Sequence, residues 1–202
     1  QSNRASVRRY NKTKRDWDLV GVAGFSLGAT EFTTITRSTS GDTYVAFRDA
    51  GTGNQMVVKE LDRGALNWGV LGDSGIGLGG SALYTQMALD KNNIPYIAYA
   101  DASNSGRVTV KRFDKENQNW QTVGRSGFSA GTTAYTALTI GNDNSPLVAY
   151  LDGGNFNKVS VKKFDPSTSS WAYLGAEGFS GGVASYVNIA VDKNNVPYAI
   201  DE

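Results

Sequence analysis

The chain has 202 residues, a formal net charge of +1, and neither cysteine nor histidine. A nearly neutral chain lacks the field that draws a protein to nucleic acid or to a membrane surface, and no run of 18 apolar residues predicts a membrane span. Without cysteine and histidine there are no disulfides, no thiolate metal sites and no Ser-His-Asp triad, and nothing in the chain predicts a cofactor.

The first predicted element is a short strand over residues 5–10. It lies in a segment, 1–16, that contains six cations and a single acid, Asp16. Basic side chains on an outer strand discourage pairing with other chains, which explains the charge without a ligand. An anion-binding patch is the alternative that the sequence leaves open.

Four tryptophans then divide the chain, and each begins a variant of W-x-x-[VL]-G-x-x-G-[FI]-[SG]. They are Trp17, Trp68, Trp120 and Trp171, spaced 51, 52 and 51 residues apart. A fixed period of this length indicates a repeat architecture. Because the same indole recurs in every copy, we expect it to pack between neighbouring units rather than to bind a ligand.

Each repeat predicts four short strands separated by Gly, Asn, Asp and Pro clusters, which is a four-stranded antiparallel sheet. The first strands are expected at 32–37, 83–89, 135–140 and 186–191. The second strands are expected at 44–48, 96–100, 147–151 and 198–200, and the third at 56–61, 108–113, 159–164 and 5–10. The fourth strand of each sheet begins at its tryptophan.

The repeats resemble the blades of β-propellers, in particular bacterial secreted or surface propellers whose repeats carry a D-x-N-N-x-P-Y-[IV]-A-Y turn and strand. Asp90-Lys-Asn-Asn-Ile-Pro-Tyr-Ile-Ala-Tyr99 matches that pattern. The resemblance implies an all-β, four-bladed β-propeller of four-stranded antiparallel blades and a secreted or cell-surface location. It is similar to hemopexin-like domains in size only, because the cysteine pair of that family is missing.

The two ends of the chain supply different strands of one blade, because 5–10 is a third strand and 198–200 a second strand. We therefore expect a single propeller domain over 1–202, closed by the N-terminal strands, with residues 1–16 completing the last blade. Such closure predicts a monomer. The joining unit is three residues shorter than the others. A fragment of a longer array, or two half-rings that pair into an eight-bladed ring, therefore remain alternatives.

The loops that lead from the fourth strand of one blade to the first strand of the next are the expected ligand site. Each runs for about 11 residues, which is longer than a tight connection, and long loops on a rigid scaffold often bind ligands. The residues predicted to contact a ligand are an aromatic near the start of each first strand and a serine in three of the loops. They are Phe32, Tyr84, Tyr135, Tyr186, Ser26, Ser129 and Ser180.

Three aspartates that end the second strands, Asp49, Asp101 and Asp152, could place carboxylates near one mouth of the ring. Oxygen ligands of this kind suit calcium. The spacing D-x-D-x-D-G is absent, however, so we predict no metal site and keep these aspartates only as an alternative.

Four related loops favour a non-catalytic, multivalent, lectin-like module that binds carbohydrate. The alternative is a structural or protein-interaction propeller without a small ligand, either a natural surface-protein domain or an engineered ring of repeats. A carboxylate-based glycosidase is the third hypothesis, since Glu31, Glu177 and Asp73 are loop acids that do not repeat. Because the binding module ranks first and the glycosidase last, we predict that the chain is not an enzyme. Its expected partner is a carbohydrate or a protein.

Overall fold

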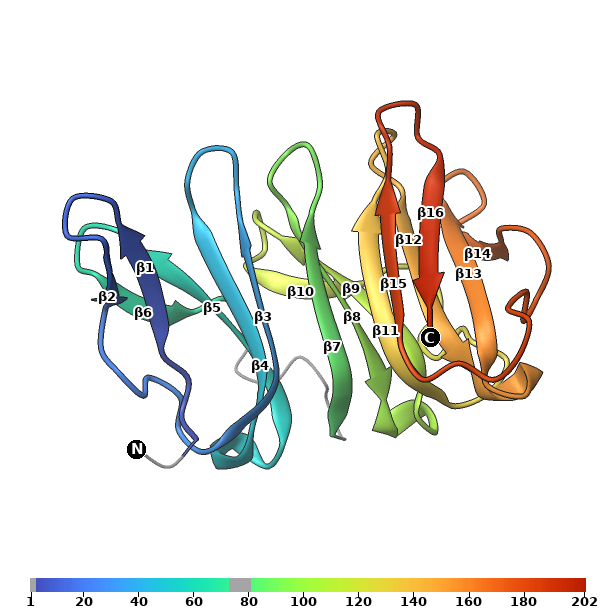
Figure 1. Cartoon of the computed structure of the whole chain (residues 1–202), viewed down its shortest axis with the longest axis horizontal. Helices are drawn as coiled ribbons and strands as arrows, with labels where there is room; N and C mark the ends of the chain where they lie inside the picture. Colours follow the sequence, from blue (N-terminus) through green and yellow to red (C-terminus); the bar gives the residue numbers. More distant parts are fainter. Residues whose placement is uncertain (1–2, 73–80) are drawn as a thin grey trace.

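The computed structural model describes residues 3–72 and 81–202, and its regular secondary structure consists almost entirely of antiparallel strands (Figure 1). An N-terminal hairpin, β1 (Val7–Asn11) and β2 (Asp16–Val20), comes first. A C-terminal hairpin, β15 (Val187–Val191) and β16 (Pro197–Asp201), comes last. None of the helices in the described part of the chain is long and apolar enough to cross a membrane.

Between the hairpins, the described residues form three complete blades of four strands each. The first blade comprises β3 (Thr30–Arg37), β4 (Thr43–Asp49), β5 (Gln55–Asp62) and β6 (Asn67–Val70). The second comprises β7 (Ala82–Leu89), β8 (Pro95–Asp101), β9 (Arg107–Asp114) and β10 (Asn119–Thr122). The third comprises β11 (Thr133–Ile140), β12 (Pro146–Asp152), β13 (Lys158–Asp165) and β14 (Ser170–Tyr173).

The second and third strands of the blades are the most buried, because sheets cover both of their faces. Every residue of β8 and of β12 is buried, which explains why these strands read as nearly continuous apolar runs. A short 3-10 turn follows the second strand in each blade: η1 (Ala50–Thr52), η2 (Ala102–Asn104) and η3 (Gly153–Asn155). The expected all-β blades and their strand order are thus confirmed.

Neighbouring blades are joined by the repeated tryptophans. The indole Nε1 of Trp68 donates to the backbone oxygen of Val20 at 3.0 Å, and that of Trp171 donates to Val123 at 2.8 Å. A phenylalanine from the preceding loop stacks on each of these indoles, with Phe128 centred 4.2 Å from Trp171. The packing role expected for the tryptophans is confirmed at these positions.

A second link between blades lies in the turns between the first and second strands. The side-chain oxygen of Asn144 accepts a hydrogen bond from the backbone of Lys91 at 3.1 Å, and that of Asn195 accepts one from Asn142 at 2.7 Å. These asparagines have positive φ angles, a conformation that Asn tolerates better than most residues. Repeated links of this kind fix the angle between successive blades.

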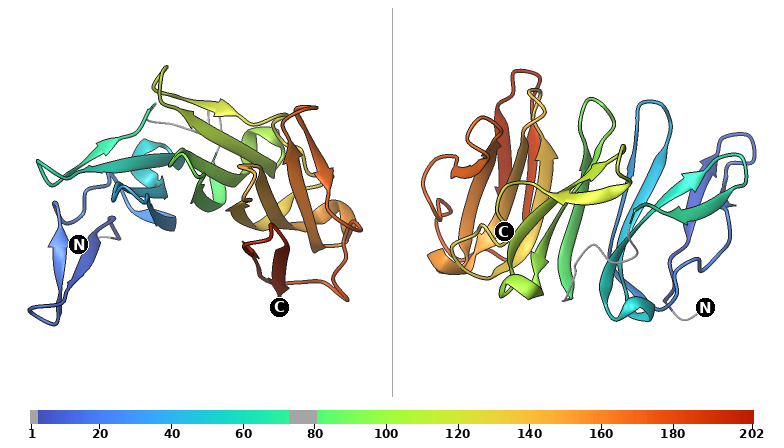
Figure 2. Two further views of the ribbon diagram at one scale, coloured as in Figure 1. Left: turned by 90° about the horizontal axis from the view of Figure 1, so that it is seen from above. Right: turned by 180° about the vertical axis from the view of Figure 1, so that it is seen from behind.

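The expected closure of the ring is not formed. Residues of β1 pair only with β2, and those of β16 pair only with β15, within the described ranges. Viewed from above, the blades follow an arch, and the two hairpins lie apart at its two ends (Figure 2). The physical reason is that the links between blades set a curvature too small for this number of blades to bring the two hairpins together.

Candidate functional site

Four aromatic side chains form a continuous row, named here the aromatic row: Phe32, Tyr84, Tyr135 and Tyr186. Three belong to the first strands β3, β7 and β11, which pack side by side on the inner side of the arch with β15, and Tyr186 directly precedes β15 (Figure 2). Successive ring centroids lie 5.1, 4.7 and 4.6 Å apart. The structure therefore brings together all four aromatics predicted as ligand contacts.

A bulge interrupts each of the first strands β3, β7 and β11 at its aromatic residue. The pairing register shifts between Glu31 and Thr34, between Leu83 and Gln86, and between Ala134 and Thr136. The aromatic at each bulge has a positive φ, from 49° to 60°. Such backbone is costly for a bulky residue, and strain of this kind often marks functional positions.

Hydroxyl groups add polar contacts to the row. The pKa of Tyr135 is raised, chiefly by a hydrogen bond with the hydroxyl of Tyr186 and then by burial. The Thr136 hydroxyl donates a hydrogen bond to the backbone oxygen of Tyr84 and so ties two inner strands together. Tyr186 is the most open member, with 55% of its surface exposed. The row thus offers ring faces and hydroxyls on rigid strands.

Glu31 lies directly before Phe32 on β3. It makes an ion pair with Arg48, the residue opposite it on β4. The carboxylate is exposed, whereas the guanidinium is mostly covered, so the sheet fixes the arginine and the arginine positions the acid. The residues at the corresponding positions before the other three aromatics are Leu83, Ala134 and Ser185, which makes Glu31 a feature of one blade.

The other predicted acid, Glu177, contacts the side-chain amide of Asn155 at 3.4 Å, outside the aromatic row. Asp73 lies outside the described residues.

The three serines predicted to contact a ligand are buried and hold the backbone. The Ser129 hydroxyl accepts from the Val108 N–H at 3.0 Å and donates to the Gly131 oxygen at 2.7 Å. Ser26 and Ser180 repeat both bonds in their own blades. With donor and acceptor used internally, these hydroxyls are poorly placed for direct ligand contact.

The aspartates at the ends of the second strands are also occupied. Asp101 accepts hydrogen bonds from the Ser103 N–H and the Thr109 hydroxyl, and Asp152 accepts equivalent bonds. Asp49 accepts three backbone N–H groups, at 2.7 to 2.9 Å, two of them from the loop that precedes β3. The described residues contain no cluster of three metal-ligating side chains. The geometry gives these carboxylates a role in capping the 3-10 turns.

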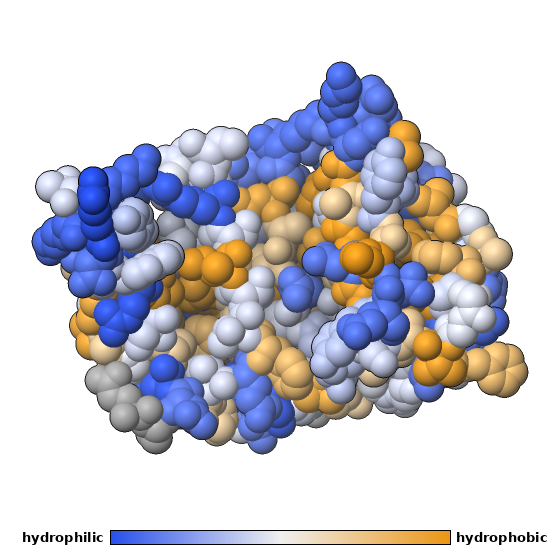
Figure 3. Space-filling view, viewed as in Figure 1, coloured by the Kyte–Doolittle hydropathy of each residue, from blue (hydrophilic) through white to orange (hydrophobic). Residues whose placement is uncertain are grey.

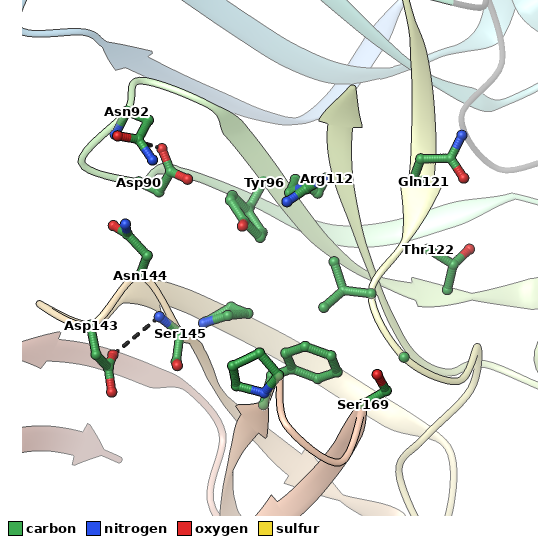
Figure 4. A pocket seen from close by; sticks show the side chains of 15 residues that line it. Asp90, Asn92, Tyr96, Arg112, Gln121, Thr122, Asp143, Asn144, Ser145 and Ser169 are labelled. Carbon is green, nitrogen blue, oxygen red and sulfur yellow. Dashed lines mark hydrogen bonds between the residues drawn. The ribbon is translucent and has the colours of Figure 1, made fainter. Parts of the chain in front are cut away.

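A pocket of about 480 Å³ between the second and third blades is a further candidate that the sequence did not predict. Figure 4 shows Asp90 and Asp143 at one side of it and Tyr96 and Arg112 at another. Two carboxylates at one cavity could in principle serve as an acid and a base. Whether Asp90 and Asp143 can do so depends on the hydrogen bonds that already engage their carboxylates.

Both carboxylates of the pocket are used by the turns that carry them. One oxygen of Asp90 accepts the N–H groups of Asn92 and Ile94 at 2.8 and 2.9 Å. Asp143 accepts from the Ser145 N–H at 3.1 Å and from the Lys163 ammonium at 2.5 Å. Burial would raise the pKa of Asp143, but these bonds outweigh it and lower the pKa. The pocket is therefore a weaker candidate than the aromatic row.

No protein-family model and no curated protein matches the chain. Solved structures do share its fold. A protein of unknown function from Dyadobacter fermentans has a TM-score of 0.61 at 11% identity, and the match covers 90% of this chain and 58% of that one. The chain thus spans little more than half the length of that protein.

Two enzymes share the fold to a similar degree. An endo-1,4-beta-xylanase from Bacteroides thetaiotaomicron has a TM-score of 0.57 at 11% identity, over 92% of this chain and 71% of the enzyme. A thermostable family-43 glycoside hydrolase has a TM-score of 0.56 at 13% identity, over 96% of this chain and 74% of the enzyme. The propeller-like fold is therefore shown.

These similarities correct two expectations from the sequence. The sequence favoured a non-catalytic, multivalent binding module, with a structural or protein-interaction propeller as the alternative, and predicted no enzyme. The comparisons contradict the non-catalytic function and the prediction that the chain is no enzyme, because the xylanase and the family-43 glycoside hydrolase that share this fold are enzymes that act on carbohydrate. The sequence was misleading because four equivalent loops suggest several equal weak sites. A search for repeated features does not detect an acid that occurs in only one blade, such as Glu31.

Proposed function

We propose that the chain processes polysaccharides by cleaving glycosidic bonds, with the sugar chain bound along the aromatic row. The observation that carries the proposal is the row itself, four successive rings in contact, three on neighbouring inner strands and one directly before the fourth. Aromatic faces pack against the apolar faces of sugars, and the tyrosine hydroxyls can hydrogen-bond to sugar hydroxyls. The named enzymes with this fold, a xylanase and a family-43 glycoside hydrolase, support the same class of substrate.

Glu31 is the proposed acid-base residue. Glycoside hydrolysis requires a carboxyl group that protonates the leaving oxygen, and a second group that activates water or attacks the sugar. Glu31 adjoins the row in sequence and is exposed, and Arg48 limits the positions its side chain can adopt. The aspartates at the ends of the second strands are excluded from this role by their backbone contacts. A secreted or surface location fits action on polysaccharides.

The test is release of reducing ends from a panel of xylan, arabinan and galactan by the purified chain. We expect turnover on at least one polymer, and a fall of about 100-fold or more in kcat for Glu31→Gln, the usual cost of losing an acid-base residue. Glu177→Gln is the matched control, because Glu177 is also a loop acid of one blade but lies outside the row. Absence of turnover on every polymer would contradict the proposal, and equal activity of the two variants would exclude Glu31.

A further inference from the structure

The two hairpins at the ends of the arch are complementary halves of a blade. In each complete blade the second strand pairs with the third, as β8 does with β9. The C-terminal hairpin contains the equivalents of the first and second strands, and the N-terminal hairpin contains those of the third and fourth. Neither hairpin has its partner strands in the described chain.

We propose that two copies of this chain associate head to tail, so that β16 of one copy pairs with β1 of the other and completes a blade at each of two junctions. Both junctions are then identical, and the assembly closes as a ring with twofold symmetry. The arch seen in Figure 2 supports two copies, because its two ends point to the same side and two arches placed end to end enclose a ring. The proposal is independent of the reaction proposed above.

The complete blades specify the register of the new strand pair. In the second blade Tyr96 lies opposite Arg112 and Ala98 lies opposite Val110. The equivalent residues in the hairpins pair Tyr198 with Arg9 and Ile200 with Val7. The β1–β2 register supports this correspondence, because Tyr10 lies opposite Trp17 as Phe113 lies opposite Trp120.

The hairpins are far more exposed to solvent than the equivalent strands of the complete blades. Tyr96 and Ala98 are 5% and 0% exposed, whereas their equivalents Tyr198 and Ile200 are 63% and 70% exposed. A two-stranded sheet that exposes such side chains is marginal in water and has an open edge. The space-filling view shows hydrophobic side chains at the surface toward both the left and the right end of the molecule (Figure 3).

The tryptophan links give a second, independent line of evidence. Every indole of a complete blade donates to a backbone oxygen of the preceding unit, as Trp120 does to Leu71 at 2.9 Å. Trp17, in contrast, is 58% exposed against 8% for Trp120. The equivalent acceptor at the other end of the arch is the backbone oxygen of Leu174. The indole of one copy is therefore matched by a carbonyl of the second copy.

The surroundings of Leu174 are shaped to receive that indole. An added Cβ on Gly124 would lie 3.2 Å from the Trp171 ring, but one on the equivalent Gly175 would meet no described atom within 4 Å. Phe179, the equivalent of the ring that stacks on Trp171, is 45% exposed. Seating Trp17 of the second copy here would cover both residues.

The charges of the two strands favour this junction, and one link between turns is absent from it. The strand β1 contains Arg8 and Arg9, and Arg4 lies three residues before it. The strand β16 ends at Asp201, which is followed by Glu202. In the expected register Asp201 lies opposite Ser6, whose neighbours on the same side of the strand are Arg4 and Arg8. Opposite charges therefore lie diagonally across the new pair, which favours the correct partner. One link of the complete blades is missing from the junction, because Gly41 replaces the asparagine that joins successive turns.

The experiment uses the absence of cysteine from the chain. We introduce Val7→Cys and Ile200→Cys together, oxidise the protein and read its mass on a denaturing, non-reducing gel. Facing cysteines in the expected register should give a covalent dimer of twice 21.6 kDa. The matched control, Val7→Cys with Ala199→Cys, moves one thiol to the other side of the sheet and should stay unlinked.

Light scattering of the unmodified chain provides the second measurement. We expect the dimer mass, at least a 30-fold weaker dimer for Trp17→Ala, and no change for Phe156→Ser, which removes an exposed aromatic that belongs to neither of the paired strands nor to the proposed seat of Trp17. A monomer mass, an internal disulfide within one chain, or linear multimers would each overturn the two-copy ring. An internal disulfide would instead establish closure within one chain.

Discussion

The indole Nε1 of Trp120 donates a 2.9 Å hydrogen bond to the backbone oxygen of Leu71, which belongs to the preceding blade. The ring is 8% exposed and lies 5.3 Å from the ring of Phe113. One side chain thereby fills the space between two sheets and satisfies a carbonyl at the end of an outer strand. The recurrence of this arrangement makes the arch rigid.

Trp120→Ala should lower the free energy of unfolding by about 3 to 5 kcal/mol, because it leaves a cavity between blades and an unpaired carbonyl. Trp120→Phe should cost less, since it retains most of the apolar volume. Urea denaturation of both variants provides the measurement. A loss under about 1 kcal/mol for the alanine variant would show that the indole does not hold the blades together.

Gly124 and Gly175 are equivalent glycines with positive φ angles of 67° and 83°. Alanine at either position pays the cost of left-handed backbone, about 1 kcal/mol or more. At Gly124 the new methyl group would also lie 2.9 Å from the Phe164 ring, whereas at Gly175 it enters open space. Gly124→Ala should therefore be the more destabilising in thermal melts of the dissociated chain, and equal losses would contradict the close contact between Gly124 and Phe164.

The repeat period and the turn chemistry predicted most of this fold. The spacing of the tryptophans located the outer strands, and Asp90-Lys-Asn-Asn-Ile-Pro95 located a turn that the structure forms with the Asp90 carboxylate at its centre. Closure could not be predicted, because it depends on the angle between blades. That angle is set by contacts such as the Asn144 to Lys91 bond, whose partners are 53 residues apart.

The sequence predicted only part of the candidate site, because the rest again depends on contacts between residues that are far apart in the chain. Tyr84 and Tyr135 were recognisable as aromatics at equivalent positions, but their alignment in one row depends on bulges in β7 and β11 that no local pattern specifies. The serines, such as Ser129, were misleading because a small hydroxyl residue in a glycine-rich loop serves equally to bind a ligand or to hold the backbone. Only the distances to the neighbouring strand distinguish the two.

Asp143 should contribute to the acid sensitivity of the protein. Burial acts against ionisation, but the bonds from Lys163 and the Ser145 N–H prevail and lower the pKa below its ordinary value of 3.8. A carboxyl whose pKa is lower in the folded state stabilises the fold above its unfolded pKa, and this stabilisation is lost as the pH falls through the folded value. Unfolding free energies measured from pH 7 to pH 2 should therefore decline less steeply for Asp143→Asn below about pH 4. Parallel curves for the variant and the parent chain would contradict the ion pair.

Tyr135 offers the sharpest separation between stacking and hydrogen bonding in the aromatic row. Its ring lies between those of Tyr84 and Tyr186, and its hydroxyl bonds to that of Tyr186. If the row binds a sugar chain, Tyr135→Ala should raise KM by up to about 10-fold, since it removes one ring worth about 0.5 to 1.5 kcal/mol. Tyr135→Phe keeps the ring and should change KM by about threefold or less, with kcat unchanged in both variants.

Tyr99→Phe, at a buried ring of the second blade, controls for general loss of a tyrosine hydroxyl. An unchanged KM for Tyr135→Ala on a polymer that the parent chain cleaves would place the substrate elsewhere on the molecule.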